Sequence, residues 1–93
     1  MKRYSVLYLL KGQYQHVTCQ TLQEAQRVLD QLHVDSKRQA VGIYDGQNQT
    51  VSLDAGYSAD VNKKQLVTIA EAVRRRDSNW YPTEQVGRLS YFA

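Results

Sequence analysis

The chain has 93 residues, of which 42% are hydrophobic and 23% charged, and its formal net charge is +3. This length fits one domain with a modest core and argues against a second core or a deeply walled substrate cavity. The single cysteine, Cys19, cannot form an internal disulfide or a thiolate zinc site, so we expect a reducing compartment.

The first apolar run, from Tyr4 to Leu10, follows two basic residues and stops at Lys11. A signal peptide would continue into a small-residue cleavage site, and a membrane span needs about 20 apolar residues. We therefore interpret this run as a strand and expect a cytoplasmic protein that has no membrane partner.

The first part of the chain predicts a β-hairpin followed by a helix. Residues 4–10 and 14–20 are rich in strand-forming side chains, and Lys11-Gly12-Gln13 closes the turn between them. Thr21 and Glu24 have the spacing of a capping box, in which the Thr hydroxyl accepts from the Glu amide. Apolar residues then recur at helical spacing, which predicts an amphipathic helix over residues 22–33.

The second part repeats this order. Residues 39–44 and 50–54 predict a second hairpin, with Asp45-Gly46 in the turn. Asn62 and Gln65 have capping-box spacing and begin a second helix, which ends near Asp77. The tail from Trp80 to Ala93 is apolar, and its residues 86–92 alternate in a way that offers a fifth strand.

These elements predict an α+β fold of order ββαββα, with a four-stranded antiparallel sheet and both helices on one face. We expect one domain, residues 1–93, divided into a first ββα unit (1–38), a second ββα unit (39–79) and the apolar tail (80–93). Residues 9–18 and 43–52 match at Gly, Gln, Gln and Val. A pseudo-twofold ββα repeat, shared turn chemistry or chance explains that match.

Side-chain alternation then locates the core. A loop of odd length in each hairpin places the aliphatic positions of both strands on one side of the sheet, beneath the helices. The predicted core consists of Leu7, Leu9, Val17, Leu29, Leu32, Val41, Ile43, Val51, Leu53, Leu66, Ile69 and Val73, with Cys19 on the same side. The other side of the first hairpin then carries Tyr4, Tyr8, Tyr14 and His16, which is too apolar for a plain solvated face.

This aromatic side predicts a small non-catalytic interaction module that acts through its sheet face or its tail. The predicted contact residues are Tyr4, Tyr8, Tyr14, His16, Trp80 and Tyr81. Three occupants would cover such a surface: the chain's own tail, a second copy in a homodimer, or a ligand. We expect the partner to be a protein, with a homodimer as the nearest case.

No residue constellation indicates catalysis, a metal or a cofactor. His16 and His33 lie on different elements and have no metal-ligand spacing with Cys19. The glycines form no phosphate-binding pattern, and caps, turns and helical ion pairs account for the best-placed carboxylates. One alternative remains in this direction: an enzyme subunit whose site is completed at an interface.

A second alternative is weak nucleic-acid binding through one side of the second helix. The residues that would contact phosphates are Lys63, Lys64, Arg74, Arg75 and Arg76. A net charge of +3 is small for that role, and the chain contains no recognised nucleic-acid reader motif. We therefore expect the basic side to be a solvated helix face, with cations suited to the helix C-terminus.

Overall fold

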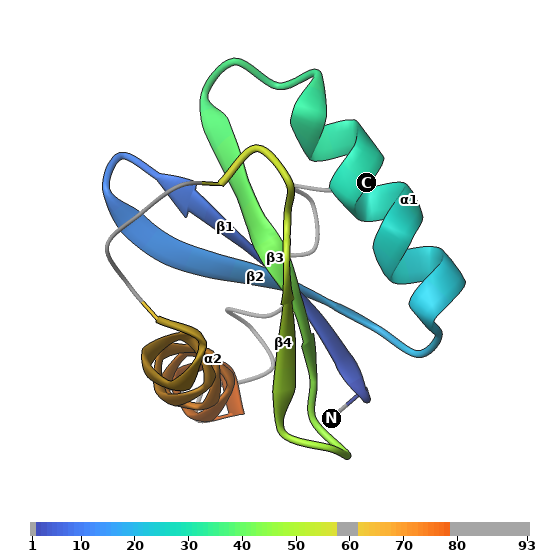
Figure 1. Ribbon diagram of the computed structural model, residues 1–93, viewed down its shortest axis with the longest axis vertical. Helices are drawn as coiled ribbons and strands as arrows, with labels where there is room; N and C mark the ends of the chain where they lie inside the picture. Colours follow the sequence, from blue (N-terminus) through green and yellow to red (C-terminus); the bar gives the residue numbers. More distant parts are fainter. Residues whose placement is uncertain (1, 58–61, 79–93) are drawn as a thin grey trace.

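The computed structural model describes residues 2–57 and 62–78. Its four strands form one antiparallel sheet in the order β2-β1-β3-β4, and two helices pack on the sheet (Figure 1). The elements are β1 (Tyr4–Leu10), β2 (Gln13–Cys19), α1 (Leu22–His33), β3 (Arg38–Asp45), β4 (Thr50–Leu53) and α2 (Lys63–Ser78). The predicted α+β class and ββαββα order are confirmed, whereas the offered fifth strand lies outside the described residues.

The first hairpin closes through a turn of only two residues. Lys11 and Gly12 both have positive φ angles, 53° and 77°, as a type I′ turn requires. Leu10 and Gln13 flank the turn as a pair, and the register continues from there without a shift to the far end of both strands. Because the turn has an even number of residues, the alternation of side chains differs from the predicted one.

The predicted side assignment of the first hairpin is therefore wrong. Leu7 lies opposite His16 and Leu9 lies opposite Tyr14, so these four residues share one side of the sheet. Val17 pairs with Val6 and belongs to the other side. Both sides of the hairpin consequently carry apolar side chains, and each side needs a cover.

The second hairpin departs from the expected alternation for two reasons: four residues, an even number, separate the paired Asp45 and Thr50, and β3 contains an irregularity. Leu7 pairs with Gly42 and Tyr8 with Ala40, which leaves Val41 as an extra residue in β3. Val41 then packs with Leu7, whereas Ile43 packs with the opposite cluster. The prediction that Val41 and Ile43 share one side is wrong for this reason.

The two helices cover opposite sides of the sheet, not one side as predicted. Helix α1 buries Ala25 and Leu32 against a cluster that includes Tyr8, and we call this the α1 side. Helix α2 buries Leu66 and Ala70 against a cluster that includes Leu7, and we call this the α2 side. Figure 1 shows the strands between the two helices. The apolar character of both sides is the physical reason for this arrangement.

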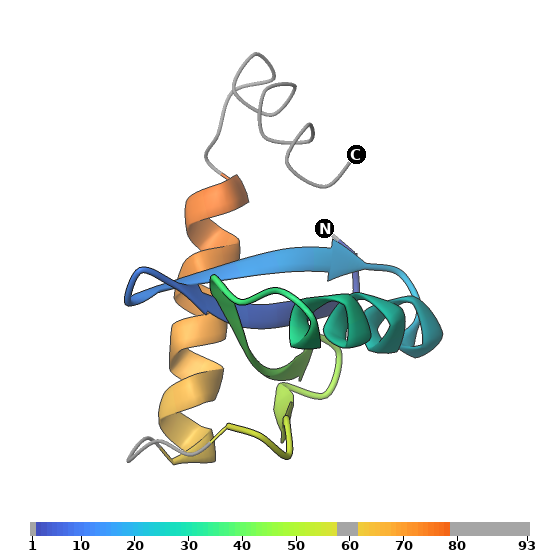
Figure 2. The same cartoon turned by 90° about the horizontal axis from the view of Figure 1, so that it is seen from above.

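This arrangement also rules out the pseudo-twofold ββα repeat. A twofold axis that exchanges the antiparallel neighbours β1 and β3 must stand perpendicular to the sheet, and it would keep both helices on one side. In addition, α2 runs across the strands, while α1 takes a different direction (Figures 1 and 2). The two matched turns also differ, with two residues between Leu10 and Gln13 and four between Asp45 and Thr50, so chance is the remaining explanation of the match between residues 9–18 and 43–52.

Both predicted capping boxes are confirmed. The Glu24 amide donates to Oγ1 of Thr21 over 3.1 Å at the start of α1. At the start of α2, the Gln65 amide donates to Oδ1 of Asn62 over 2.8 Å, and the Asn62 amide donates to Oε1 of Gln65 over 3.1 Å. These local bonds satisfy amides that the first helical turn leaves without partners, so both helix starts follow from sequence alone.

The predicted core residues are mostly covered, but they do not form one cluster. Leu7, Val41 and Leu66 are fully buried on the α2 side, whereas Leu32 and Ile43 belong to the α1 side. Leu9, Val17, Leu29 and Ile69 are only half-buried, and Leu53 is 40% exposed. The sheet therefore has a separate core on each side.

We expect Leu66→Ala to lower the free energy of unfolding by about 2–5 kcal/mol, because it opens a cavity in a fully buried position. Leu22→Ala is the matched control: Leu22 is 48% exposed, and its replacement should cost less than about 1 kcal/mol. Urea denaturation followed by circular dichroism measures both values. Equal midpoints for the two variants would contradict the packing of α2 described above.

Candidate functional site

The structure divides the predicted aromatic surface between the two sides of the sheet. Tyr4 and Tyr8 belong to the α1 side, whereas Tyr14 and His16 lie on the α2 side opposite Leu9 and Leu7. Tyr8 and His16 are buried, and Tyr4 and Tyr14 are half-buried. The remaining two predicted contact residues, Trp80 and Tyr81, lie outside the described residues. The four strand residues therefore do not form one continuous surface.

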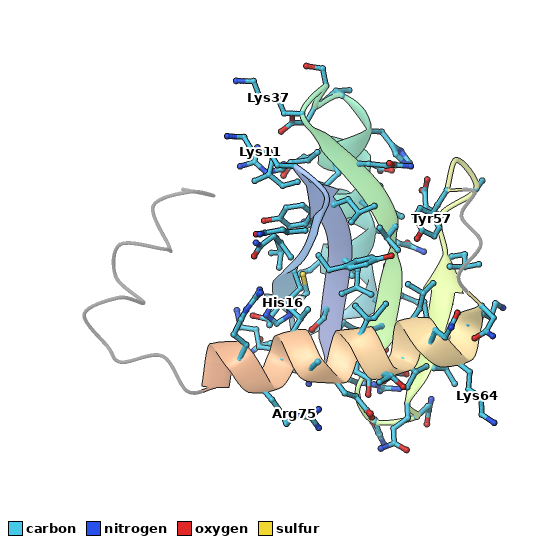
Figure 3. All side chains as sticks on the ribbon, turned by 90° about the vertical axis from the view of Figure 1, so that its left-hand side faces the viewer. Lys11, His16, Lys37, Tyr57, Lys64 and Arg75 are labelled. Atoms are coloured by element: carbon cyan, nitrogen blue, oxygen red, sulfur yellow. The ribbon has the colours of Figure 1, made fainter. Side chains whose placement is uncertain are left out.

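Of the predicted contact residues, Tyr14 lies at the end of the α2 side that also bears Leu9 and Tyr57. We call these three residues the tyrosine end. Helix α2 crosses the strands at the opposite end from Lys11, so it does not lie over the hairpin end of the sheet (Figure 3). Leu9 and Tyr14 are half-buried and pack against the α2-side cluster, whereas Tyr57 is a buried member of that cluster. The tyrosine end is thus an apolar area that α2 covers only in part.

A contact between two tyrosines organises this end of the sheet. The hydroxyls of Tyr14 and Tyr57 lie 3.0 Å apart, although the residues come from β2 and from the loop after β4. Burial and the bond to Tyr14 raise the pKa of Tyr57 to about 12. Its hydroxyl therefore stays protonated and keeps a donor at a mostly apolar surface. Tyr57 was not predicted here, because its position depends on how the loop after β4 folds back.

A second polar group lies at the other end of the α2 side and joins three elements. Nδ1 of His16 lies 3.0 Å from Oγ of Ser5, and Arg74 donates to the same Oγ over 2.6 Å. Because Arg only donates, the Ser5 hydroxyl accepts from Arg74, and the tautomer of His16 decides which group donates in the bond between Ser5 and His16. This resembles an activated serine, but Ser5 is 0% exposed, so a substrate has no access to it.

The same helix end makes further contacts that hold α2 across the sheet. Arg74 donates to the backbone oxygen of Lys2 over 3.0 Å, and its guanidinium lies 5.4 Å from the ring centre of Tyr44. One turn earlier, Glu71 accepts from the Tyr44 hydroxyl over 3.1 Å. Burial, followed by the bond to Glu71, raises the pKa of Tyr44. We conclude that Ser5, His16, Tyr44, Glu71 and Arg74 form a structural network.

The structure does not bring the predicted phosphate contacts together as one surface. Lys63 and Lys64 are exposed in the first turn of α2, and Arg75 is exposed in its last turn. Arg74 turns toward the sheet, as described above, and Arg76 donates to Oε1 of Gln15 over 3.1 Å. Two of the five cations therefore serve contacts within the chain.

These placements predict different roles for two neighbouring arginines. Arg74→Ala removes charged hydrogen bonds to Ser5 and Lys2, and we expect it to lower the free energy of unfolding by about 1–3 kcal/mol. Arg75→Ala changes an exposed side chain of the same helix turn and should cost less than about 0.5 kcal/mol. Thermal and urea denaturation of both variants test this difference. Equal losses would mean that the network does not hold α2.

Sequence analysis did not predict the pair formed by His33 and Asp54. Nε2 of His33 lies 2.6 Å from Oδ1 of Asp54, and the other carboxylate oxygen accepts from the Gly56 amide over 3.0 Å. The Asp54 side chain is 7% exposed and that of His33 is 49% exposed. No sequence signal joins two residues on separate elements, although a histidine in the last turn of a helix suits the helix dipole.

A buried carboxylate that orients an imidazole is also part of many catalytic and metal sites. Such sites need a further reactive group or further ligands. Within the described ranges, the structure gathers no three His, Cys, Asp or Glu side chains that could hold a metal ion. The His33–Asp54 pair therefore has one evident role, which is to connect the end of α1 to the end of β4.

Cys19 lies buried at the end of β2, with 2% of its surface exposed. Burial, and next the charge of Glu24, raise the pKa of its thiol. The reactive thiolate is therefore scarce near neutral pH. We expect a thiol reagent such as dithionitrobenzoate to react slowly with the folded protein, and at the ordinary rate of a free cysteine once urea unfolds it. Fast reaction of the folded protein would contradict the buried position.

No family model, curated protein or solved structure matches this chain. In the part of the chain that the structure describes, no helix has the length and apolar character needed to cross a bilayer. The residues themselves therefore carry the functional argument.

Proposed function

We propose that the chain is a small non-catalytic protein-interaction module whose contact surface is the tyrosine end of the α2 side. The observation that carries this proposal is the pairing of Tyr14 and Tyr57, 3.0 Å apart, on a part of the sheet that α2 leaves partly open. Tyrosines give a large contact area at a low entropic cost and retain a hydroxyl for a wet rim, which suits protein contacts.

The absence of catalysis is part of the proposal and rests on accessibility. The serine beside a histidine is fully buried. The cysteine is buried with a raised pKa. His33 is accessible, but its carboxylate partner already explains its position at the end of α1. Each group therefore has a structural explanation.

Nucleic-acid binding is the weaker alternative. Phosphate contacts need several cations along one surface, because affinity grows with the number of phosphates neutralised. Arg74 and Arg76 are used within the chain. Lys64 and Arg75, at opposite ends of the helix, are separated by roughly 16 Å of helix rise. This spacing leaves few cations to act together.

Site-specific photocrosslinking in the source cells tests the proposed surface. The crosslinking amino acid p-benzoylphenylalanine replaces Tyr14 in the full chain, and in a control it replaces Thr68, which is exposed on α2. We expect a discrete adduct at position 14, formed with one protein, and much less at position 68. Mass spectrometry of the adduct distinguishes a second copy of this chain from another protein.

Two results would contradict the proposal. Equal adduct patterns at positions 14 and 68 would show that the tyrosine end has no special partner. Adducts with nucleic acid at position 68 and none with protein at position 14 would favour the alternative function.

A further inference from the structure

Strand β2 forms an edge of the described sheet, and it has none of the features that usually protect an edge. It contains seven residues, Gln13–Cys19, with no proline, lysine, arginine or carboxylate among them. Its register with β1 contains no bulge. The opposite edge strand, β4, has only four residues. Short strands, charges, prolines and bulges are the devices that keep edges from pairing with other chains. The sequence of β2 has none of them, and the charge at this edge comes from α2, whose Arg76 donates to Oε1 of Gln15.

The two-residue turn determines which backbone groups of β2 face outward. In such a hairpin the residues flanking the turn, Leu10 and Gln13, exchange hydrogen bonds, and every second pair after them does the same. Gln15 and Val17 therefore direct their amides to β1. Tyr14 and Thr18 direct theirs away from it, toward the open edge.

Helix α2 is longer than the sheet is wide. Its 16 residues span about 24 Å, whereas the three spacings between the four strands add up to about 14 Å. The helix contacts β4, β1 and β2. Figure 2 shows its orange end extending beyond β2. The last turn of α2 thus overhangs a position where a further strand would lie.

We propose that this edge pairs with β2 of a second copy, so that two chains form one continuous eight-stranded antiparallel sheet. The proposal rests on the proposed function and names the partner of the interaction module. A twofold axis perpendicular to the sheet and close to His16 sets Tyr14 of one copy opposite the partner's Thr18. The outward amides of both residues then find acceptors on the other chain.

The same axis supplies a cover for the tyrosine end. In each copy α2 crosses the sheet at the Ser5 end of the strands, because Arg74 binds Ser5 there. Rotation by 180° about an axis near His16 moves the overhanging helix end to the opposite end of the strands. That position lies over Leu9 and Tyr14 of the first copy, where α2 of its own chain is missing.

A second copy fits the edge better than an unrelated strand for two reasons. Apart from His16, β2 contains no residue that carries a charge near neutral pH, so few like charges meet when it lies against itself. The overhanging end of α2 and the open tyrosine end lie on the same side of the sheet. One twofold rotation therefore places the helix end of each copy over the tyrosine end of the other. An unrelated strand would pair with the edge but would not bring the second helix.

Proline substitutions at the two edges test the proposal in the full chain. Thr18→Pro removes an outward amide and leaves the bonds to β1 in place, because proline is tolerated where an edge amide faces outward. By the same register argument Leu53 has its amide on the outer edge of β4, and Leu53→Pro is the matched control. Sedimentation equilibrium gives the mass and the Kd of each form.

We expect a dimer for the unchanged chain and for Leu53→Pro. In Thr18→Pro the Kd should rise roughly tenfold to a hundredfold. The substitution removes one interchain hydrogen bond from each chain, and therefore two from the dimer. Hydrogen–deuterium exchange provides the second measurement. The amides of Tyr14 and Thr18 should be protected in the dimer, and the protection of Tyr14 should fall on dilution. The amides of Gln15 and Val17 should stay protected throughout and show that the fold is intact.

Three results would overturn the proposal. The first is a monomer in which the Tyr14 and Thr18 amides exchange at the unprotected rate. The second is a dimer that Thr18→Pro and Leu53→Pro affect equally. The third is a monomer in which both amides are protected until Leu89→Pro is introduced, with Thr83→Pro as control, since residues 86–92 of the same chain would then occupy the edge. Adducts with another protein at position 14 in any of these cases would leave the proposed function standing without the dimer.

Discussion

The two-residue turn at Lys11 and Gly12 decides how the rest of the molecule is arranged. It fixes the register of β1 and β2 and thereby places Tyr14 and His16 on the side of Leu7, and Val17 on the side of Val6. A turn with one more residue would exchange the two sides of β2, because side chains alternate along a strand. With apolar residues on both sides, one helix cannot protect the sheet. The opposite placement of α1 and α2 follows from that constraint.

The position of α2 depends on polar contacts as much as on apolar burial. Leu66 and Ala70 anchor the helix on the sheet, but apolar packing alone permits several crossing directions. Arg74 restricts the choice, since its bonds to Ser5 and to Lys2 hold the last turns at one end of the strands. A helix held there cannot also cover Tyr14. The structural network and the tyrosine end are therefore two results of one arrangement.

Local sequence signals predicted the elements well, and relations between elements poorly. Both helix starts lie at their capping boxes because a cap depends on residues three positions apart. The side assignments failed because they depend on turn length and on the extra residue Val41, which no local pattern indicates. For the site, Tyr14 was recognised from strand alternation. Its partner Tyr57 was not, because a loop brings it across the sheet.

The chain protects the two edges of its described sheet from pairing with other chains to different degrees. The chain leaves β4 after four residues, and the Asp54 amide still bonds to the backbone oxygen of Val41, so this edge ends in a closed turn. Such a turn leaves little edge for another chain. β2, by contrast, is an edge strand of seven residues with no lysine, arginine or carboxylate in its sequence. Helix α2 covers the α2 side at its Ser5 end and leaves the tyrosine end open. The two ends of the β2 edge therefore differ in their cover. The proposed antiparallel copy brings its own helix and would satisfy both the edge and the open end.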